Sequence, residues 1–199
     1  MKQIFYLVRH GEKVPEPGDP GLTALGRTHA TQTGTFLLDK HVTKIIASPL
    51  LRTKETAGII SDIVAVPYTT SALLKERMNW GDDPSLSFNE FLAQWNSATE
   101  HREWKPPVGD SSVQSGERME SVIESEGAGA QTCLLVTHGG IIADYILNVF
   151  TNQEIKAVST IFLTAKEDCI AECSVTCIEH DTVTKKYSLR TLASTEHLQ

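Results

Sequence analysis

Short apolar runs alternate with stretches of helical periodicity along most of the chain. Thr23 can cap a helix that runs to about Asp39, and Pro49 stands near a second helix start, where its missing N–H is tolerated. Apolar side chains from Ile141 to Phe150 recur at helical spacing. The apolar runs themselves are predicted strands, at residues 2–8, 44–47, around 66, 133–137, 158–164, 170–179 and 184–192.

Strands that alternate with helices and are apolar throughout are typical of a parallel sheet covered on both faces. We therefore predict an α/β fold, a three-layer α/β/α arrangement with a mainly parallel central sheet, as a single domain over residues 1–199. Residues 78–112 depart from this pattern because they hold all three tryptophans, Trp80, Trp95 and Trp104. We expect this stretch to be a helical lid insertion, with Trp80 near the site and Trp95 in the core.

The composition is that of an ordinary globular protein, with 40% hydrophobic and 22% charged residues. A net charge of −7 argues against nucleic acid or an anionic membrane as the main partner. The apolar run at residues 4–8 is too short for a signal peptide core, and no run reaches the ~18 apolar residues of a membrane span. We expect a cytoplasmic location.

Three of the four cysteines, Cys169, Cys173 and Cys177, are spaced by four, which would place them on one face of a strand. A zinc site usually needs a second paired cluster, and the chain has none. We predict reduced, packed thiols and no metal or cofactor, with a metal site or a disulfide as the alternative.

Two predicted strands end at a histidine followed by glycine: Arg9-His10-Gly11 and His138-Gly139-Gly140. Strand ends are where α/β proteins build their sites, and an arginine beside a histidine indicates anion chemistry, with phosphate the favoured anion. A neutral imidazole is a competent nucleophile, and an adjacent arginine disfavours its protonated form. The alternative for His10 is a side chain that merely fills a turn.

His138 opens a predicted helix, so free backbone N–H groups should face the site. Arg52 lies in the first turn of another helix, where its charge opposes the helix dipole. This electrostatic cost suggests that the side chain binds an anion; the alternative is a solvated arginine on the surface.

Five ordered segments carry a resemblance to a known family: residues 7–12 (LVRHGE), 19–26 (DPGLTALG), 48–57 (SPLLRTKETA), 74–77 (LKER) and 136–140 (VTHGG). Together they resemble the histidine phosphatase superfamily, the phosphoglycerate mutase-like fold, in its phosphatase branch. The resemblance implies a metal-independent phosphoryl transfer in which His10 becomes phosphohistidine. Arg9, Arg52 and His138 would hold the phosphoryl oxygens, and Glu76 would protonate the leaving alkoxide. The implied substrate-binding set is Arg9, Gly11, Thr23, Arg52, Glu76, His138 and Gly139.

The chain departs from the mutases of this family. Residues 13–16 (KVPE) replace their serine, aromatic residue and asparagine, and the second motif reads HGG rather than HGN. Both differences favour hydrolysis, with a small phosphorylated metabolite or a phosphoprotein as the substrate. Because residues 78–112 contain few basic residues, we also predict poor affinity for multiply phosphorylated substrates. A mutase-type phosphotransferase and a non-catalytic phosphate-binding module remain alternatives, and a homodimer stays open.

Overall fold

The computed structural model describes residues 2–125, 127–164 and 169–199. Within these ranges, six strands form one mixed sheet in the order β3-β2-β4-β1-β5-β6. The first four strands in that order run parallel, and β5 runs antiparallel to both of its neighbours, β1 and β6. The strands are β1 (Lys2–Arg9), β2 (Lys44–Ala47), β3 (Tyr68–Thr70), β4 (Thr132–Thr137), β5 (Val175–Asp181) and β6 (Lys186–Ser194). The predicted α/β fold with a mainly parallel sheet is confirmed.

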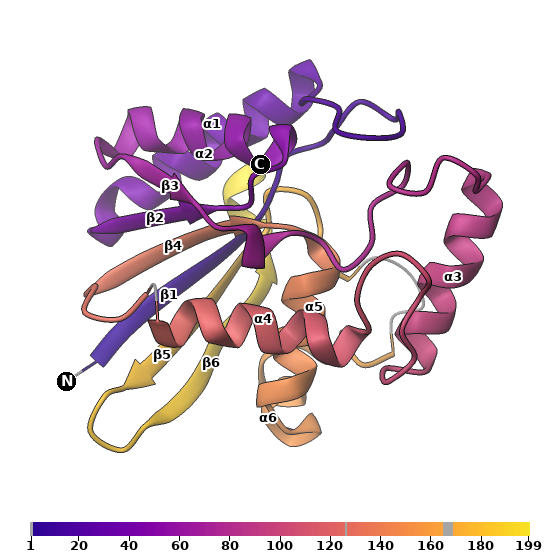
Figure 1. Ribbon diagram of the computed structural model, residues 1–199. Helices are drawn as coiled ribbons and strands as arrows, with labels where there is room; N and C mark the ends of the chain where they lie inside the picture. The colour runs from indigo at the N-terminus through magenta and orange to yellow at the C-terminus, as the bar shows by residue number, and fades with distance from the viewer. Residues whose placement is uncertain (1, 126, 165–168) are drawn as a thin grey trace.

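Helices cover both faces of this sheet (Figure 1). On one face, α1 (Ala24–Leu37) and α2 (Leu51–Val64) pack on alternate residues of β4, such as Leu134 and Val136. On the other, α4 (Ser112–Ser125) and α5 (Gly139–Val149) pack on Cys133 and Leu135. The remaining helices are α3 (Phe88–Glu100), α6 (Asn152–Val158) and the 3₁₀ turns Leu38–Lys40, Ala72–Leu74 and Glu196–Leu198. No helix in the described ranges is long and apolar enough to cross a bilayer.

Two of the predicted strands are placed differently by the structure, and the strand expected at 170–179 begins only at Val175, because Cys173 takes a left-handed backbone conformation just before it. The strand expected around residue 66 lies later, as β3, because Ala65 takes a left-handed conformation (φ 56°) that ends α2 first. The strand expected at 158–164 is wrong. A capping box of Thr151 and Glu154 starts α6 at Asn152, and the helix ends at Val158. The chain then turns up to Thr164, and Phe162 is buried in the core.

The expected row of cysteines on one strand face is also wrong. Of the three, only Cys177 lies in a strand, β5. Cys173 precedes the strand with a left-handed backbone (φ 55°), which breaks the alternation of side chains. Burial raises the pKa of the Cys173 thiol to about 12, so this side chain packs as a neutral group.

The carboxyl ends of β1, β2 and β4 reach the same edge of the sheet, which we call the carboxyl edge. Arg9 is level with Thr137, and Ala47 is level with Val136. The ladder continues one residue further, because the His10 N–H donates to the Thr137 carbonyl and the Ser48 N–H donates to the Val136 carbonyl, both at 2.9 Å. Residues 10, 48 and 138 therefore leave the sheet side by side.

Candidate active site

The two histidines predicted from the strand ends meet at the carboxyl edge. The rings of His10 and His138 lie 5.2 Å apart between centroids, edge to face, and both are buried. They line a cavity of about 330 Å³ together with other predicted site residues, Arg9, Arg52, Glu76 and Gly139. Residues from four separate parts of the sequence thus meet in one cavity.

Hydrogen bonds to His10 define which ring nitrogen carries the proton. Arg52 Nε–H donates to His10 Nε2 at 3.2 Å, so Nε2 presents a lone pair. His10 Nδ1 then carries the hydrogen and donates to the Gly11 carbonyl at 2.7 Å. Burial, followed by the charges of Arg52 and Arg9, lowers the pKa of His10 well below 6.5. The ring is therefore neutral, and the lone pair on Nε2 faces the guanidinium of Arg52.

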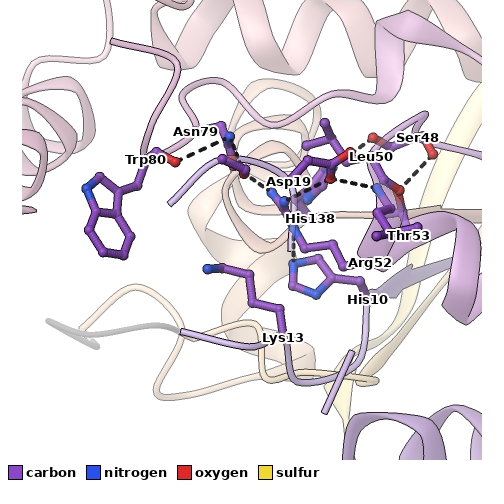
Figure 2. Close-up of polar contacts among 12 residues, drawn as sticks. His10, Lys13, Asp19, Ser48, Leu50, Arg52, Thr53, Asn79, Trp80 and His138 are labelled. Atoms are coloured by element: carbon purple, nitrogen blue, oxygen red, sulfur yellow. Dashed lines mark hydrogen bonds and ion pairs between the residues drawn. The ribbon is translucent and has the colours of Figure 1, made fainter. Parts of the chain in front are cut away.

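Arg52 projects from the first turn of α2 and is almost fully buried. Its Nη2 donates to Asn79 Oδ1 at 3.1 Å (Figure 2). Its Nη1 is buried without a hydrogen-bond partner in the described part of the chain. Asp19 offsets the charge at this helix start, since its carboxylate accepts the Leu51 N–H at 2.7 Å and lies 3.9 Å from Arg52 Nη1. A donor held without an acceptor is what an anion site requires.

His138 is held by Ser48, the residue that follows β2. Its Nε2 lies 2.8 Å from Ser48 Oγ, and its buried Nδ1 has no partner among the described residues. Burial, then the charges of Arg52 and His10, lowers the pKa of His138 well below 6.5. With Ser48 donating to Nε2, the proton on Nδ1 becomes a second donor without an acceptor.

The N-terminus of α5 is occupied in a way that the sequence did not suggest. The N–H groups of Gly140 and Ile141 donate to the Glu76 carboxylate at 2.8 and 2.9 Å, and the Arg77 N–H donates to it at 2.9 Å. The expectation that free N–H groups of Gly140 and its neighbours face the anion is wrong for these two positions. They fix the orientation of Glu76 instead. A side chain at position 140 is excluded, since a Cβ there would lie 2.6 Å from Glu76 Oε1.

Arg9 and Lys13 add positive charge to the cavity wall. Arg9 Nη2 pairs with Glu172 at 2.8 Å, and Nη1 donates to the Ile170 carbonyl at 2.6 Å. The Lys13 ammonium donates to the carbonyls of Val14 and Glu16. Burial and the charges of Arg52 and Arg9 lower the pKa of Lys13.

Two predicted substrate contacts, Gly11 and Thr23, do not line the cavity. Gly11 packs against the start of α1, where a Cβ would lie 2.5 Å from the Gly26 carbonyl oxygen. Thr23 caps α1 by accepting the Gly26 N–H at 3.0 Å, and its hydroxyl donates to Glu12 at 2.5 Å. Both residues therefore hold the loop that carries His10.

The sequence matches the model of a known family, the histidine phosphatase superfamily (branch 1), over residues 5–190. The chain belongs to this superfamily. It is 33% identical over 155 residues to a probable phosphoglycerate mutase GpmB of Yersinia enterocolitica, which covers 70% of each chain. It is 30% identical over 173 residues to a protein of the same name from Erwinia tasmaniensis, covering 77% of this chain and 79% of that one.

Solved structures share the histidine phosphatase fold at low sequence identity. Mycobacterial glucosyl-3-phosphoglycerate phosphatase superposes with a TM-score of 0.73 at 20% identity, covering 98% of this chain and 100% of that one. YhfR of Bacillus stearothermophilus gives 0.71 at 22% identity, over 99% and 100% of the two chains. Phosphoserine phosphatase of Entamoeba histolytica gives 0.70 at 19%, again over 99% and 100%.

Several cavity residues of this histidine phosphatase family member were not predicted from the sequence as site residues. They are Lys13, Asn79 and Glu172, together with the side chains of α3 described below. Ser48, which contacts His138 but does not line the cavity, was not predicted as a site residue either. Trp95 was expected in the core, and that expectation is wrong, because its half-buried indole lines the cavity. Two signals were available in the sequence: Lys13 directly follows the RHGE motif, and Ser48 begins the segment 48–57. No group of three or more His, Cys, Asp or Glu residues in the described ranges is arranged to hold a metal ion.

Proposed function

We propose that this chain is a metal-independent phosphatase that hydrolyses phosphomonoesters through a phosphohistidine on His10. The observation that carries the proposal is the buried pairing of a neutral His10 lone pair with Arg52, beside two buried nitrogens that have no hydrogen-bond partner among the described residues, Arg52 Nη1 and His138 Nδ1. A tetrahedral dianion supplies oxygens that bind the Arg52 guanidinium and the His138 ring, and an electrophile for the lone pair of His10.

The first half of the reaction transfers the phosphoryl group to the enzyme. Oxygens of the phosphoryl group accept from Arg9, Arg52 and His138, which releases Arg52 Nε from His10 Nε2. His10 Nε2 then attacks phosphorus while the bond between phosphorus and the alcohol oxygen breaks. Because phosphoryl transfer passes through a loose transition state, catalysis is mainly positioning and charge stabilisation. The buried guanidinium of Arg52 supplies that stabilisation in a medium that screens charge weakly.

Glu76 completes both half-reactions. In the first it donates a proton to the departing alkoxide, which leaves as a neutral alcohol. In the second it accepts a proton from the water that attacks phosphohistidine, so His10 and the carboxylic acid are both regenerated. The three backbone N–H groups on its oxygens keep the carboxyl group aimed at the cavity throughout.

A phosphoglycerate mutase is the second candidate, because the curated relatives named above carry that activity in their names. A mutase must hold a small, highly anionic substrate in two orientations. Among the described residues that line the cavity, Arg9, Lys13 and Arg52 all lie at the phosphoryl end, and Arg9 is already paired with Glu172. Among the described residues, the far end of the cavity has no cation that would hold a carboxylate and a second phosphate.

The two candidates separate in one experiment. The chain should release inorganic phosphate from 4-nitrophenyl phosphate at an undiminished rate in EDTA. Phosphorus NMR should show no interconversion of 2- and 3-phosphoglycerate when 2,3-bisphosphoglycerate is added as primer. Interconversion faster than phosphate release would establish the mutase. Tight binding of vanadate with neither reaction would establish a non-catalytic phosphate-binding module.

A further inference from the structure

Helix α3 turns an apolar stripe toward the cavity rather than toward the protein core. Phe88, Phe91, Leu92 and Trp95 recur at the i, i+3, i+4 and i+7 positions of one helix face, and all four line the cavity. Phe88 is 47% exposed and Leu92 is 37% exposed. Helices of globular proteins normally bury such a stripe against the core. Here the stripe is available to an occupant of the cavity.

The aromatic side chains form a continuous row. Ring centroids are 4.8 Å apart for Trp80 and Phe88, 6.4 Å for Phe88 and Phe91, and 6.2 Å for Phe91 and Trp95. These spacings are those of contacting aromatic pairs. At the inner end, Trp95 lies against Gly140, where a Cβ would be 2.6 Å from its ring. The row therefore begins beside the Glu76 carboxylate and runs outward.

Charge is distributed unevenly between the two walls of the cavity. The cations Arg9, Lys13 and Arg52 belong to β1, the loop after it and α2. Residues 78–101, which supply the apolar wall, contain no lysine or arginine. The same stretch has four acidic residues, Asp82, Asp83, Glu90 and Glu100, none of which lines the cavity. A second anionic group on the substrate would meet no cation from this stretch, whereas an uncharged ring would contact apolar side chains.

We propose that the α3 stripe binds the alcohol half of the substrate and selects phosphomonoesters of uncharged aromatic alcohols. This inference rests on the proposed function, since the ester oxygen must lie between His10 and Glu76 for the ring to reach the row. Burial of a phenyl group on this wall should raise kcat/KM on the order of 10- to 100-fold.

The test compares alcohols of similar reactivity, so that leaving-group chemistry does not decide the result. The substrates are 3-phenylpropyl phosphate, propyl phosphate and glycerol 1-phosphate. We expect the wild-type chain to prefer the phenyl compound over both others by at least about tenfold in kcat/KM. Phe91→Ala and Leu92→Ala should each bring the ratio of phenylpropyl to propyl phosphate toward one. Trp104→Ala is the matched control, because Trp104 is exposed in the same part of the chain and does not line the cavity.

A binding measurement separates recognition from turnover. 3-Phenylpropylphosphonate, which is not hydrolysed, should inhibit the wild-type chain at least about tenfold more strongly than propylphosphonate, and Phe91→Ala should remove the difference. Equal kcat/KM for the phenyl and propyl esters would overturn the aromatic preference while leaving the phosphatase intact. Absence of hydrolysis of every ester would instead overturn the proposed function. A chain that sediments as a dimer, becomes a monomer on Phe91→Ala and keeps its substrate ratio would show that a second copy covers the stripe, which also overturns the inference.

Discussion

The carboxyl edge and the α3 segment (residues 78–111) face each other across one cavity but are built in opposite ways. At the edge, His10, Arg52 and His138 are buried, polar and held by hydrogen bonds to neighbouring elements. In α3 the cavity-facing side chains are apolar and partly exposed, and Ala98 is the buried residue of that helix. The edge continues a sheet whose register is fixed on both sides, whereas α3 stands beside the sheet (Figure 1).

This contrast indicates a division of labour. In the proposed reaction, the edge binds the phosphoryl group, which every phosphomonoester presents in the same form. The α3 wall would contact the alcohol, which differs from one substrate to the next. Changes at the edge should therefore reduce all activities together, and changes in α3 should alter the ranking of substrates.

The largest effect is expected from His10→Ala. Loss of the nucleophile should lower kcat/KM by at least about 10⁴-fold, and by the same factor for 4-nitrophenyl, propyl and 3-phenylpropyl phosphates. His101→Ala is the control, since His101 is an exposed histidine at the end of α3, and it should change each value less than about twofold. A loss that depends strongly on the alcohol would contradict the claim that changes at the edge reduce all activities together.

Glu76 lies where the two regions meet, so its replacement should discriminate by leaving group. Glu76→Gln keeps the shape of the side chain but cannot donate the proton. We expect kcat/KM to fall on the order of 10²- to 10³-fold for propyl phosphate and by less than about tenfold for 4-nitrophenyl phosphate. Nitrophenolate leaves without a proton, which is the reason for the difference. Equal losses for both esters would assign the proton donor to another group.

Arg77 joins the two regions physically. Its buried guanidinium donates to Asp144 of α5 at 2.8 Å and to Thr99 of α3 at 2.5 Å, and it lies 3.8 Å from the centre of the Trp95 ring. Arg77→Met should lower the free energy of unfolding by about 3 kcal/mol, because it leaves a buried carboxylate without its partner. Urea denaturation measures this loss, and adding Asp144→Leu should recover at least about half of it. A double variant as unstable as the single one would contradict the account of this pair.

The smallest effect concerns protonation at the edge. In the free enzyme, the pKa values of His10 and His138 lie well below 6.5, since burial and Arg52 disfavour the charged rings. As the pH drops below 6.5, these two histidines become protonated in the unfolded chain before they do so in the folded chain. The free energy of unfolding should therefore decrease as the pH falls through that range. Ring-nitrogen NMR in phosphate-free buffer, assigned with His10→Ala and His138→Ala, should show both imidazoles neutral at about pH 6. Protonation near pH 6.5 would contradict the neutral nucleophile.

Much of the carboxyl edge could be predicted from the sequence because its placement depends on local patterns. An apolar run that ends at Arg9 or Thr137 predicts where a parallel strand stops, and parallel strands end at a common edge. Arg52 follows from the same logic, as a first-turn residue of the next helix. The family resemblance then supplied Glu76, which no local pattern indicates.

Other features depend on contacts that no local pattern contains. The N–H groups of Gly140 and Ile141 bind a carboxylate that lies 64 residues earlier in the chain. The stripe of α3 has the same periodicity whether it faces a core or a ligand, so Trp95 was assigned to the core. The segment 158–164 is apolar enough for a strand, but the capping box at Thr151 makes the preceding residues a helix instead.

Identification of the phosphorylated residue tests the central claim most directly. The wild-type chain should be mixed rapidly with 4-nitrophenyl phosphate, quenched in alkali and digested, and the phosphopeptides mapped by mass spectrometry. We expect one acid-labile phosphoryl group, on His10. A phosphoryl group on His138 or Ser48, or turnover with no phosphorylated enzyme at any time, would contradict it.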